Sequence, residues 1–268
     1  MIIDSHVHIS NPPLFNMSPE IVIESMQKYN IDISIVSNGD SAECDHNQND
    51  ISSEYQVSQI ESINKTIQFA KENKNKIFAA LWLKPKNEEP SDELESLIEN
   101  NLDVVKALKF HPYHSATPFD SPRIQAYFYL AQKYNLPVIT HTGIGNCDNC
   151  QLVYKMAKQY PEIKFIMAHL GLASDNLEAI ELCNKQDNLY GDTAWVPVSS
   201  TQLFIQKNGS EKILFGSDNP IDGVDTYHHN PYGQRSIYQD YFFNLQNLIS
   251  STDYENLMYK NAKNIFNI

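Results

Sequence analysis

The chain has 268 residues, of which 41% are hydrophobic, so it is long enough to bury a sizeable core. Its 33 acidic and 20 basic side chains give a formal net charge of -13. Because nucleic acids and anionic membranes are bound by basic patches, this acidic balance argues against both as partners.

The chain shows no sign of secretion or membrane insertion. No basic segment followed by a long apolar stretch opens it, and no apolar run approaches the roughly 18 residues of a membrane span. Four cysteines in a chain of this length do not make a disulfide framework, so we expect a reducing, cytoplasmic environment. The residues leave the choice between a monomer and a homo-oligomer open.

Short apolar runs alternate along the chain with segments of helical periodicity. The runs predict strands at residues 1–10, 31–37, 76–84, 104–110, 136–140, 164–168, 189–194 and 212–215. Helices are predicted at residues 18–29, 54–72, 121–134, 149–160, 175–184, 199–207, 233–250 and 253–266, and a further helix is predicted to begin at residue 91. Two of them open on a Ser-Pro pair, Ser18-Pro19 and Ser121-Pro122, which is typical of a helix start.

This alternation of strand and helix predicts the fold class. It implies parallel strands joined by right-handed crossovers. Eight such units in 268 residues fit an α/β fold, a closed (β/α)₈ TIM barrel with an extra C-terminal helix, which we expect to be a single domain over residues 1–268. An open doubly wound sheet is the competing architecture, but no Gly-x-Gly-x-x-Gly follows the first strand.

Polar residues fall where the predicted strands end. His6 and His8 leave the first strand on one face, because residues i and i+2 of a strand point the same way. Four further strands, the fourth, fifth, sixth and eighth, end respectively at Lys109 with His111, at His141, at His169 and at Asp218. In a barrel these ends share one rim, where active sites of such barrels lie.

Histidine nitrogens and a carboxylate gathered at one rim predict a metal site. They suit a borderline divalent ion, most of all Zn²⁺, with Mn²⁺, Fe²⁺ or Co²⁺ as alternatives. A metal held by three histidines and one aspartate keeps a position for water, and it lowers the pKa of that water toward neutrality.

The same segments resemble the amidohydrolase superfamily, and within it the amidohydrolase-related branch of hydrolases and decarboxylases. The resemblance lies in residues 3–8 (Ile-Asp-Ser-His-Val-His), 107–112, 139–143, 168–171, 214–220 and 261–266. It implies a (β/α)₈ barrel in which His6, His8, His141 and Asp218 bind the metal directly. It also implies that His169 either binds metal or acts as an acid or base, and that Asp218 handles the proton of the metal-bound water.

Lys109 separates two types of site within that resemblance. In binuclear members a carboxylated lysine from the fourth strand bridges two metals, whereas in the related branch such a lysine would bind a substrate anion. The sequence Lys-Phe-His-Pro at 109–112 resembles the related branch, so we favour one metal with Lys109 and His111 as substrate-binding residues. Cys147 and Cys150 form a Cys-x-x-Cys pair near the site, but no partner for zinc or redox chemistry is evident.

Three functions fit these residues. The leading expectation is metal-dependent hydrolysis of a small ester, lactone or amide-like substrate, with Asp218 and His169 as catalytic residues. The alternative is non-oxidative decarboxylation of an aromatic or unsaturated carboxylic acid with the same ligands. A non-catalytic metal-binding protein on this fold is the alternative from a different class.

Overall fold

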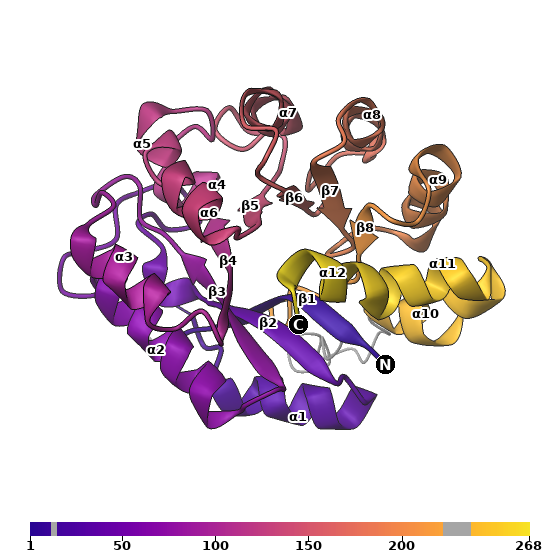
Figure 1. Cartoon of the computed structure of the whole chain (residues 1–268), viewed down its shortest axis with the longest axis horizontal. Coiled ribbons are helices and arrows are strands. Elements are labelled where there is room, and N and C mark those ends of the chain that lie inside the picture. Colours follow the sequence, from indigo (N-terminus) through magenta and orange to yellow (C-terminus); the bar gives the residue numbers. More distant parts are fainter. Residues whose placement is uncertain (12–14, 222–236) are drawn as a thin grey trace.

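Eight parallel strands form a nearly closed barrel in the computed structural model, which describes residues 1–11, 15–221 and 237–268 (Figure 1). The strands are paired in chain order: β1 Ile3–Ile9, β2 Ile33–Asn38, β3 Ile77–Trp82, β4 Val105–Phe110, β5 Val138–His141, β6 Phe165–Ala168, β7 Leu189–Asp192 and β8 Ile213–Leu214. Between β8 and β1 the segment after β8 closes the ring, because Ser5 N donates to Phe215 O at 2.9 Å and His8 N to Asn219 O at 2.8 Å. The predicted (β/α)₈ barrel is therefore confirmed.

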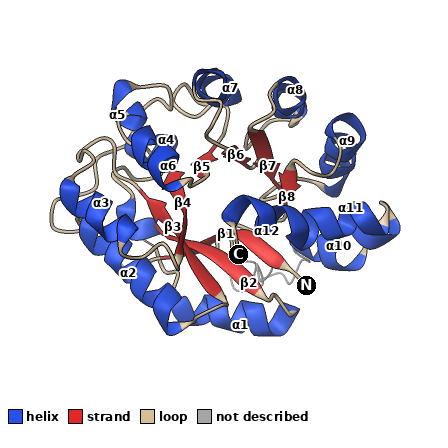
Figure 2. Cartoon of the chain, in the orientation of Figure 1, coloured by secondary structure: helices blue, strands red, loops and turns tan. Residues whose placement is uncertain are grey.

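Most of the helices surround the strands on the outside, and α12 lies over one end of the barrel (Figure 2). They are α1 Pro19–Tyr29, α2 Gln59–Glu72, α3 Asp92–Glu99, α4 Pro112–Ser115, α5 Pro122–Gln125, α6 Phe128–Tyr134, α7 Cys150–Gln159, α8 Leu177–Lys185, α9 Val198–Asn208, α10 Ile237–Phe243, α11 Ser251–Glu255 and α12 Asn261–Phe266. Short turns of other helix types are η1 Gly39–Ser41, η3 Leu245–Asn247 and the π-helical η4 Asn256–Lys260. Within the described ranges, no helix combines the length and the apolar character that a membrane span needs.

Several helices differ from the prediction. The helix expected at 54–72 begins only at Gln59, and the one expected at 253–266 consists of α11, η4 and α12. The one expected at 121–134 is two helices, since Tyr127 turns inward and its hydroxyl donates to Gln59 Oε1 and Glu88 O at 3.1 and 3.0 Å. Of the helix expected at 233–250, residues 233–236 lie outside the described residues, and the rest is α10 and η3. Helix α4 has only four residues, too few for a periodic pattern, and was not expected.

A one-residue bulge in β1 decides which way the first two histidines point. Pairing with β2 shifts register between Asp4 and Val7, so the inward-facing positions change from odd to even. Ile3 thus packs inside the barrel, Val7 packs outward against the helices, and His6 and His8 turn inward at the other end of the strand. Without the bulge, the alternation that buries Ile3 inside would turn both histidines away from the barrel axis.

The interior of the barrel is apolar at its N-terminal end. Ile3, Ile35, Ala107, Ile139, Ile166 and Leu214 meet there with Ala262, Ile265 and Phe266. The last three come from α12, which closes this end of the barrel and lies near the centre of the view in Figure 1. The C-terminal helix expected from the sequence is therefore a plug, and the polar rim lies at the opposite end.

Removing the ring of this plug should destabilise the whole barrel. Phe266 is 2% exposed, so Phe266→Ala loses its transfer free energy and leaves a cavity, which we expect to lower the free energy of unfolding by about 3–5 kcal/mol. Urea denaturation measures this loss, with Leu248→Ala, at a side chain that is 51% exposed, as the control. Equal losses in the two variants would contradict a plug.

Candidate metal centre and its cavity

The predicted rim residues meet at the floor of one cavity. It has a volume of about 410 Å³, and its lining includes His6, His8, His141, His169 and Asp218. Lys109 lies beneath them, fully buried, with Nζ 2.9 Å from His6 Nε2. Five separate strands thus deliver the side chains that the sequence placed at strand ends.

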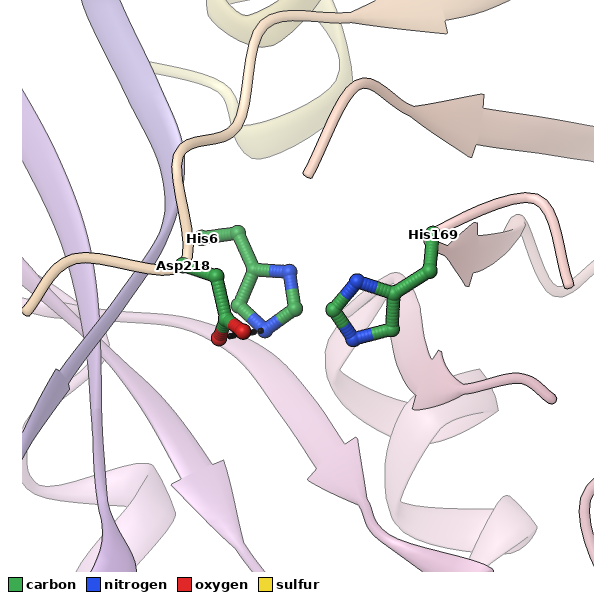
Figure 3. Close-up of side chains that lie close together, drawn as sticks. All are labelled: His6, His169 and Asp218. Atoms are coloured by element: carbon green, nitrogen blue, oxygen red, sulfur yellow. Dashed lines mark ion pairs between the residues drawn. The ribbon is translucent and has the colours of Figure 1, made fainter. Parts of the chain in front are cut away.

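Three of these side chains come close enough to share one ion. His6, His169 and Asp218 each offer one ligand atom, and these atoms all lie within 4.8 Å of one another (Figure 3). His8 joins them, because its Nε2 is 3.0 Å from Asp218 Oδ1 and 3.1 Å from His6 Nε2. Three histidine nitrogens and a carboxylate oxygen therefore gather at one place, an arrangement that suits a bound cation. We call His6, His8, His169 and Asp218 the ligand cluster.

His141 is held differently. Its ring lies edge-on to His169, with 4.8 Å between centroids, but its Nε2 is 3.4 Å from Asp148 Oδ2. Asp148 is a buried carboxylate from the loop after β5, and it was not among the predicted site residues. His141 thus lies beside the ligand cluster, with one nitrogen directed at a carboxylate outside it.

Asp192, at the end of β7, is a central residue that the prediction missed. Its Oδ2 accepts from His6 Nδ1 at 2.8 Å, and its Oδ1 accepts from the backbone N–H groups of His169 and Ala194 at 2.9 and 3.0 Å. The strand was expected to continue to residue 194, which placed Asp192 inside it rather than at its end. The sequence did contain a signal: Asp192 lies two residues after Tyr190, whose side chain packs in the barrel interior, so the two side chains point to the same face of β7.

Hydrogen bonds to the far side of each ring fix how the histidines face the centre. A carboxylate accepts from His6 Nδ1, and the Ala194 carbonyl, at 3.1 Å, accepts from His169 Nδ1. Because these partners only accept, each Nδ1 carries the hydrogen and each neutral ring turns the lone pair of Nε2 to the cluster. Metal-binding histidines are commonly oriented in this way.

Burial keeps these groups in forms that bind cations. It lowers the pKa of His169 to about 4 and that of His6 well below its ordinary value, so both rings are neutral at neutral pH. Burial opposes ionisation of Asp218, but nearby histidines, His6 foremost, outweigh it and hold the pKa of this carboxyl below its usual range. Burial also lowers the pKa of Lys109 to about 8.

The backbone is strained where it delivers these side chains. His169, Leu170, Trp195 and Asp218 have φ angles of 71°, 48°, 60° and 61°, in the left-handed region that side chains other than glycine rarely adopt. Such residues cost about 1–3 kcal/mol each and cluster at functional sites. Here the turns after β6, β7 and β8 direct His169 and Asp218 back over the barrel mouth, where Trp195 Nε1 donates to Asp218 Oδ2 at 2.7 Å.

Aromatic rings form the wall above this floor. His111 stacks on His141 with 4.0 Å between ring centroids, and Trp82 stacks on the other face of His111 at 5.0 Å. Cys147 and Cys150 are not members of the ligand group found among the described residues. Burial raises the pKa of both thiols, so they stay protonated.

Glu43 links three loops of the rim. Its backbone N–H donates to His114 O at 2.9 Å, and its carboxylate accepts from the N–H groups of Lys86 and Asn87 at 3.1 and 2.7 Å. The loops after β2, β3 and β4 are therefore joined at one buried residue. Burial raises the pKa of this carboxyl to about 7, against the hydrogen bonds that it accepts.

A family model described as amidohydrolase matches residues 3–268. Several solved structures are similar over almost their whole length. The 5-carboxyvanillate decarboxylase from Sphingomonas paucimobilis is 12% identical with a TM-score of 0.71, and the match covers 100% of this chain and 99% of that chain. The 5-carboxyvanillate decarboxylase from Novosphingobium aromaticivorans, with bound manganese, is 10% identical with a TM-score of 0.73 and coverage of 100% of this chain and 97% of that chain. A dihydroxybenzoic acid decarboxylase from Polaromonas, with bound manganese and 2-nitroresorcinol, is 12% identical with a TM-score of 0.70 and coverage of 99% of this chain and 96% of that chain. At these identities the likeness shows a shared fold. The curated proteins gave no match.

Loss of the Asp192 carboxylate should weaken metal binding. In Asp192→Asn the single amide oxygen is needed by the backbone N–H groups of His169 and Ala194, which leaves the NH₂ group facing His6 Nδ1–H in place of an acceptor. Changes of such supporting groups typically weaken metal affinity about 10- to 100-fold. Calorimetric titration of the metal-free protein with Mn²⁺ measures the change. Asp187→Asn, at a fully exposed aspartate just before the same strand, is the matched control. Unchanged affinity in Asp192→Asn would contradict the supporting role.

Glu43 should make stability fall as the pH rises. Its folded-state pKa of about 7 lies above the ordinary 4.5, so the folded protein binds this proton more tightly than the unfolded chain. The stabilisation is present below pH 4.5 and is lost as the pH rises through 7, by roughly 1–3 kcal/mol. Between about pH 5 and pH 8, the unfolding free energy should fall by about that much more in the native protein than in Glu43→Gln.

The control for this comparison is Glu54→Gln, at an exposed glutamate of the same loop between β2 and α2, which should follow the native pH profile. A Glu43→Gln profile parallel to the native one would show that Glu43 does not titrate between these pH values.

Proposed function

Because this chain belongs to the amidohydrolase family, we propose that it is a metal-dependent enzyme that removes CO₂ from a small aromatic or unsaturated carboxylic acid. The observation that carries the proposal is a cavity with two contrasting parts. Its floor holds the ligand cluster with the buried Lys109, and its walls are largely rings and aliphatic side chains, including Trp82, Trp195 and Leu172. A planar acid matches this cavity, with its carboxylate on the floor and its ring between the walls.

The metal ligands that we propose are His6, His8, His141 and Asp218, with His169 as a further ligand or as a proton carrier. The donor set fits a divalent cation, since Asp192 and Ala194 O leave lone pairs of His6 and His169 directed at the cluster. Two of the similar structures hold manganese, so Mn²⁺ stands beside Zn²⁺ as the candidate ion. When bound, the ion supplies Lewis-acid polarisation of the substrate carboxylate and of a neighbouring oxygen.

The chain's own residues then orient the acid and move a proton. Lys109, buried beneath the cluster with Nζ 2.9 Å from His6 Nε2, supplies a positive charge under the floor that favours binding of the substrate carboxylate. When the bond between the ring carbon and the carboxylate breaks, its electron pair stays on the ring carbon, which takes up a proton. That proton comes from solvent: we assign its transfer to His169 Nε2 and Asp218, which face the same point of the cavity, take it up from water and pass it to the carbon as CO₂ leaves. The apolar walls exclude water from the carbon.

Hydrolysis through a metal-activated water, the expectation that we placed first from the sequence, is the second candidate. The Asp218 carboxylate favours it, because Oδ1 lies between His6 Nε2 and His8 Nε2 at 3.4 and 3.0 Å, where it can take a proton from water. We place decarboxylation first, since the similar structures named above are decarboxylases and the walls suit a ring. A non-catalytic metal-binding protein would bind the ion and turn over neither class.

Turnover in heavy water separates these functions. With Mn²⁺ and a panel of hydroxybenzoates in D₂O, we expect CO₂ release and a product with one deuterium on the carbon that lost the carboxylate. A chelator should abolish the reaction and Mn²⁺ should restore it. Asp218→Asn should lower kcat by about 10²–10⁴-fold, because a group that moves the proton is lost.

The control variant is Asp187→Asn, which should keep native turnover because its side chain is fully exposed. Hydrolysis of esters or lactones with ¹⁸O taken from water, and no CO₂ from any acid, would replace decarboxylation by hydrolysis. Metal binding without either reaction would contradict both.

A further inference from the structure

Two histidines of the cavity wall take no part in the ligand cluster. His111 follows β4, and His114 lies one turn later in α4. Both line the cavity and are partly exposed to it. Their hydrogen bonds to the backbone determine which ring nitrogen carries the hydrogen, and therefore what each ring offers to a molecule in the cavity.

His114 is fixed as a ring with its hydrogen on Nδ1. This nitrogen lies 2.8 Å from Cys44 O, and a carbonyl oxygen only accepts, so Nδ1–H is the donor. Burial lowers the pKa of His114, which keeps the ring neutral. A neutral ring with its hydrogen on Nδ1 has a lone pair on Nε2. His114 therefore offers an acceptor on the edge of the ring away from Cys44.

His111 is fixed in the opposite tautomer. Its Nδ1 accepts a hydrogen bond from the backbone N–H of His114 at 3.3 Å, so this nitrogen carries no hydrogen. The hydrogen of the neutral ring must then lie on Nε2. His111 therefore offers a donor on the edge away from the backbone, and the two neighbouring rings, whose centroids are 4.4 Å apart, present one donor and one acceptor.

Both rings are held rigidly, as a site that discriminates between ligands requires. His111 lies between Trp82 and His141, at 5.0 and 4.0 Å, with interplanar angles of 15° and 13°. His114 O accepts from the N–H groups of Glu43 and Cys44 at 2.9 and 2.7 Å, so the loop after β2 is bonded to both the backbone and the ring of His114.

We propose that His111 Nε2–H and His114 Nε2 form a donor–acceptor pair that binds a hydroxyl or neutral amino group on the body of the substrate. Such a group both donates and accepts, so one substituent satisfies both nitrogens. The inference rests on the proposed function, in that the occupant of the cavity is taken to be a ring-bearing acid. The floor recognises the carboxylate, and the pair on the wall recognises a substituent elsewhere on the same molecule.

The tautomers themselves are the first test. In protein labelled with ¹⁵N-histidine, long-range ¹H–¹⁵N correlations should show the hydrogen of His111 on Nε2 and that of His114 on Nδ1. The signals are assigned by their loss in His111→Phe and His114→Phe. The same tautomer at both residues, or the two assignments reversed, would overturn the proposal without any variant having to bind a ligand.

The second test compares two neutral probes, resorcinol and 1,3-dimethoxybenzene, which keeps the oxygens but loses the donors. Calorimetry should show that the native protein binds resorcinol at least about tenfold more tightly, as expected for hydrogen bonds in a largely buried site. His111→Phe and His114→Phe keep an aromatic ring in place, and each should bring the ratio of affinities close to one. His46→Phe, at an exposed histidine outside the cavity lining, should keep the native ratio.

A third probe, 1,3-diaminobenzene, distinguishes a substrate amino group from a substrate hydroxyl group. Binding tighter than that of resorcinol, and lost in the same two variants, would identify the group as amino rather than hydroxyl and would support the pair. An unaltered ratio in both variants, or no preference in the native protein, would overturn it. These probes carry no carboxylate, so failure of decarboxylation and failure of the pair are separate results.

Discussion

One buried carboxylate organises the centre of this molecule. Asp192 connects the side chain of His6 on β1 with the backbone that follows β6 and β7, so three strand ends meet at its two oxygens. A buried charge is costly unless it is paired or neutralised, and burial indeed raises the pKa of Asp192. With neutral histidines, Asp192 and Asp218 face one buried cation among the residues that the structure describes here, Lys109. A bound divalent ion would reverse that balance, which is why the cluster suits one.

The barrel and most of its rim could be predicted from the sequence. Apolar runs of strand length alternate with amphipathic segments, and histidines at strand ends must share a rim once the sheet closes. The bulge between Asp4 and Val7 could not be predicted, because it depends on pairing with β2 and on the need to bury Ile3. Asp192 and Asp148 were missed for a related reason. Asp192 acts through a contact across the barrel with His6, and Asp148 acts because the loop after β5 folds back onto His141. Parity within a strand can mark Asp192 as inward-facing, but it does not reveal either partner.

In the proposed function, the floor and the walls of the cavity have different roles. The floor holds nitrogens and carboxylates that the same family resemblance assigns to hydrolases and decarboxylases alike, so it sets a class of chemistry. In that proposal the walls, which include Trp82, His111, His114 and Trp195, would determine which molecule reaches the floor. Because the walls are largely apolar, charges on the floor act in a medium of low polarisability, where each interaction counts for more than in water.

The walls also contain both tryptophans of the chain. Trp82 stacks on His111, and the indole N–H of Trp195 is bonded to Asp218, whose carboxylate faces the ligand cluster. The near-ultraviolet fluorescence of the indole groups therefore originates entirely within the cavity. The protein carries its own optical reporter, and the filling of the floor or of the wall can be followed in the native chain without an added dye.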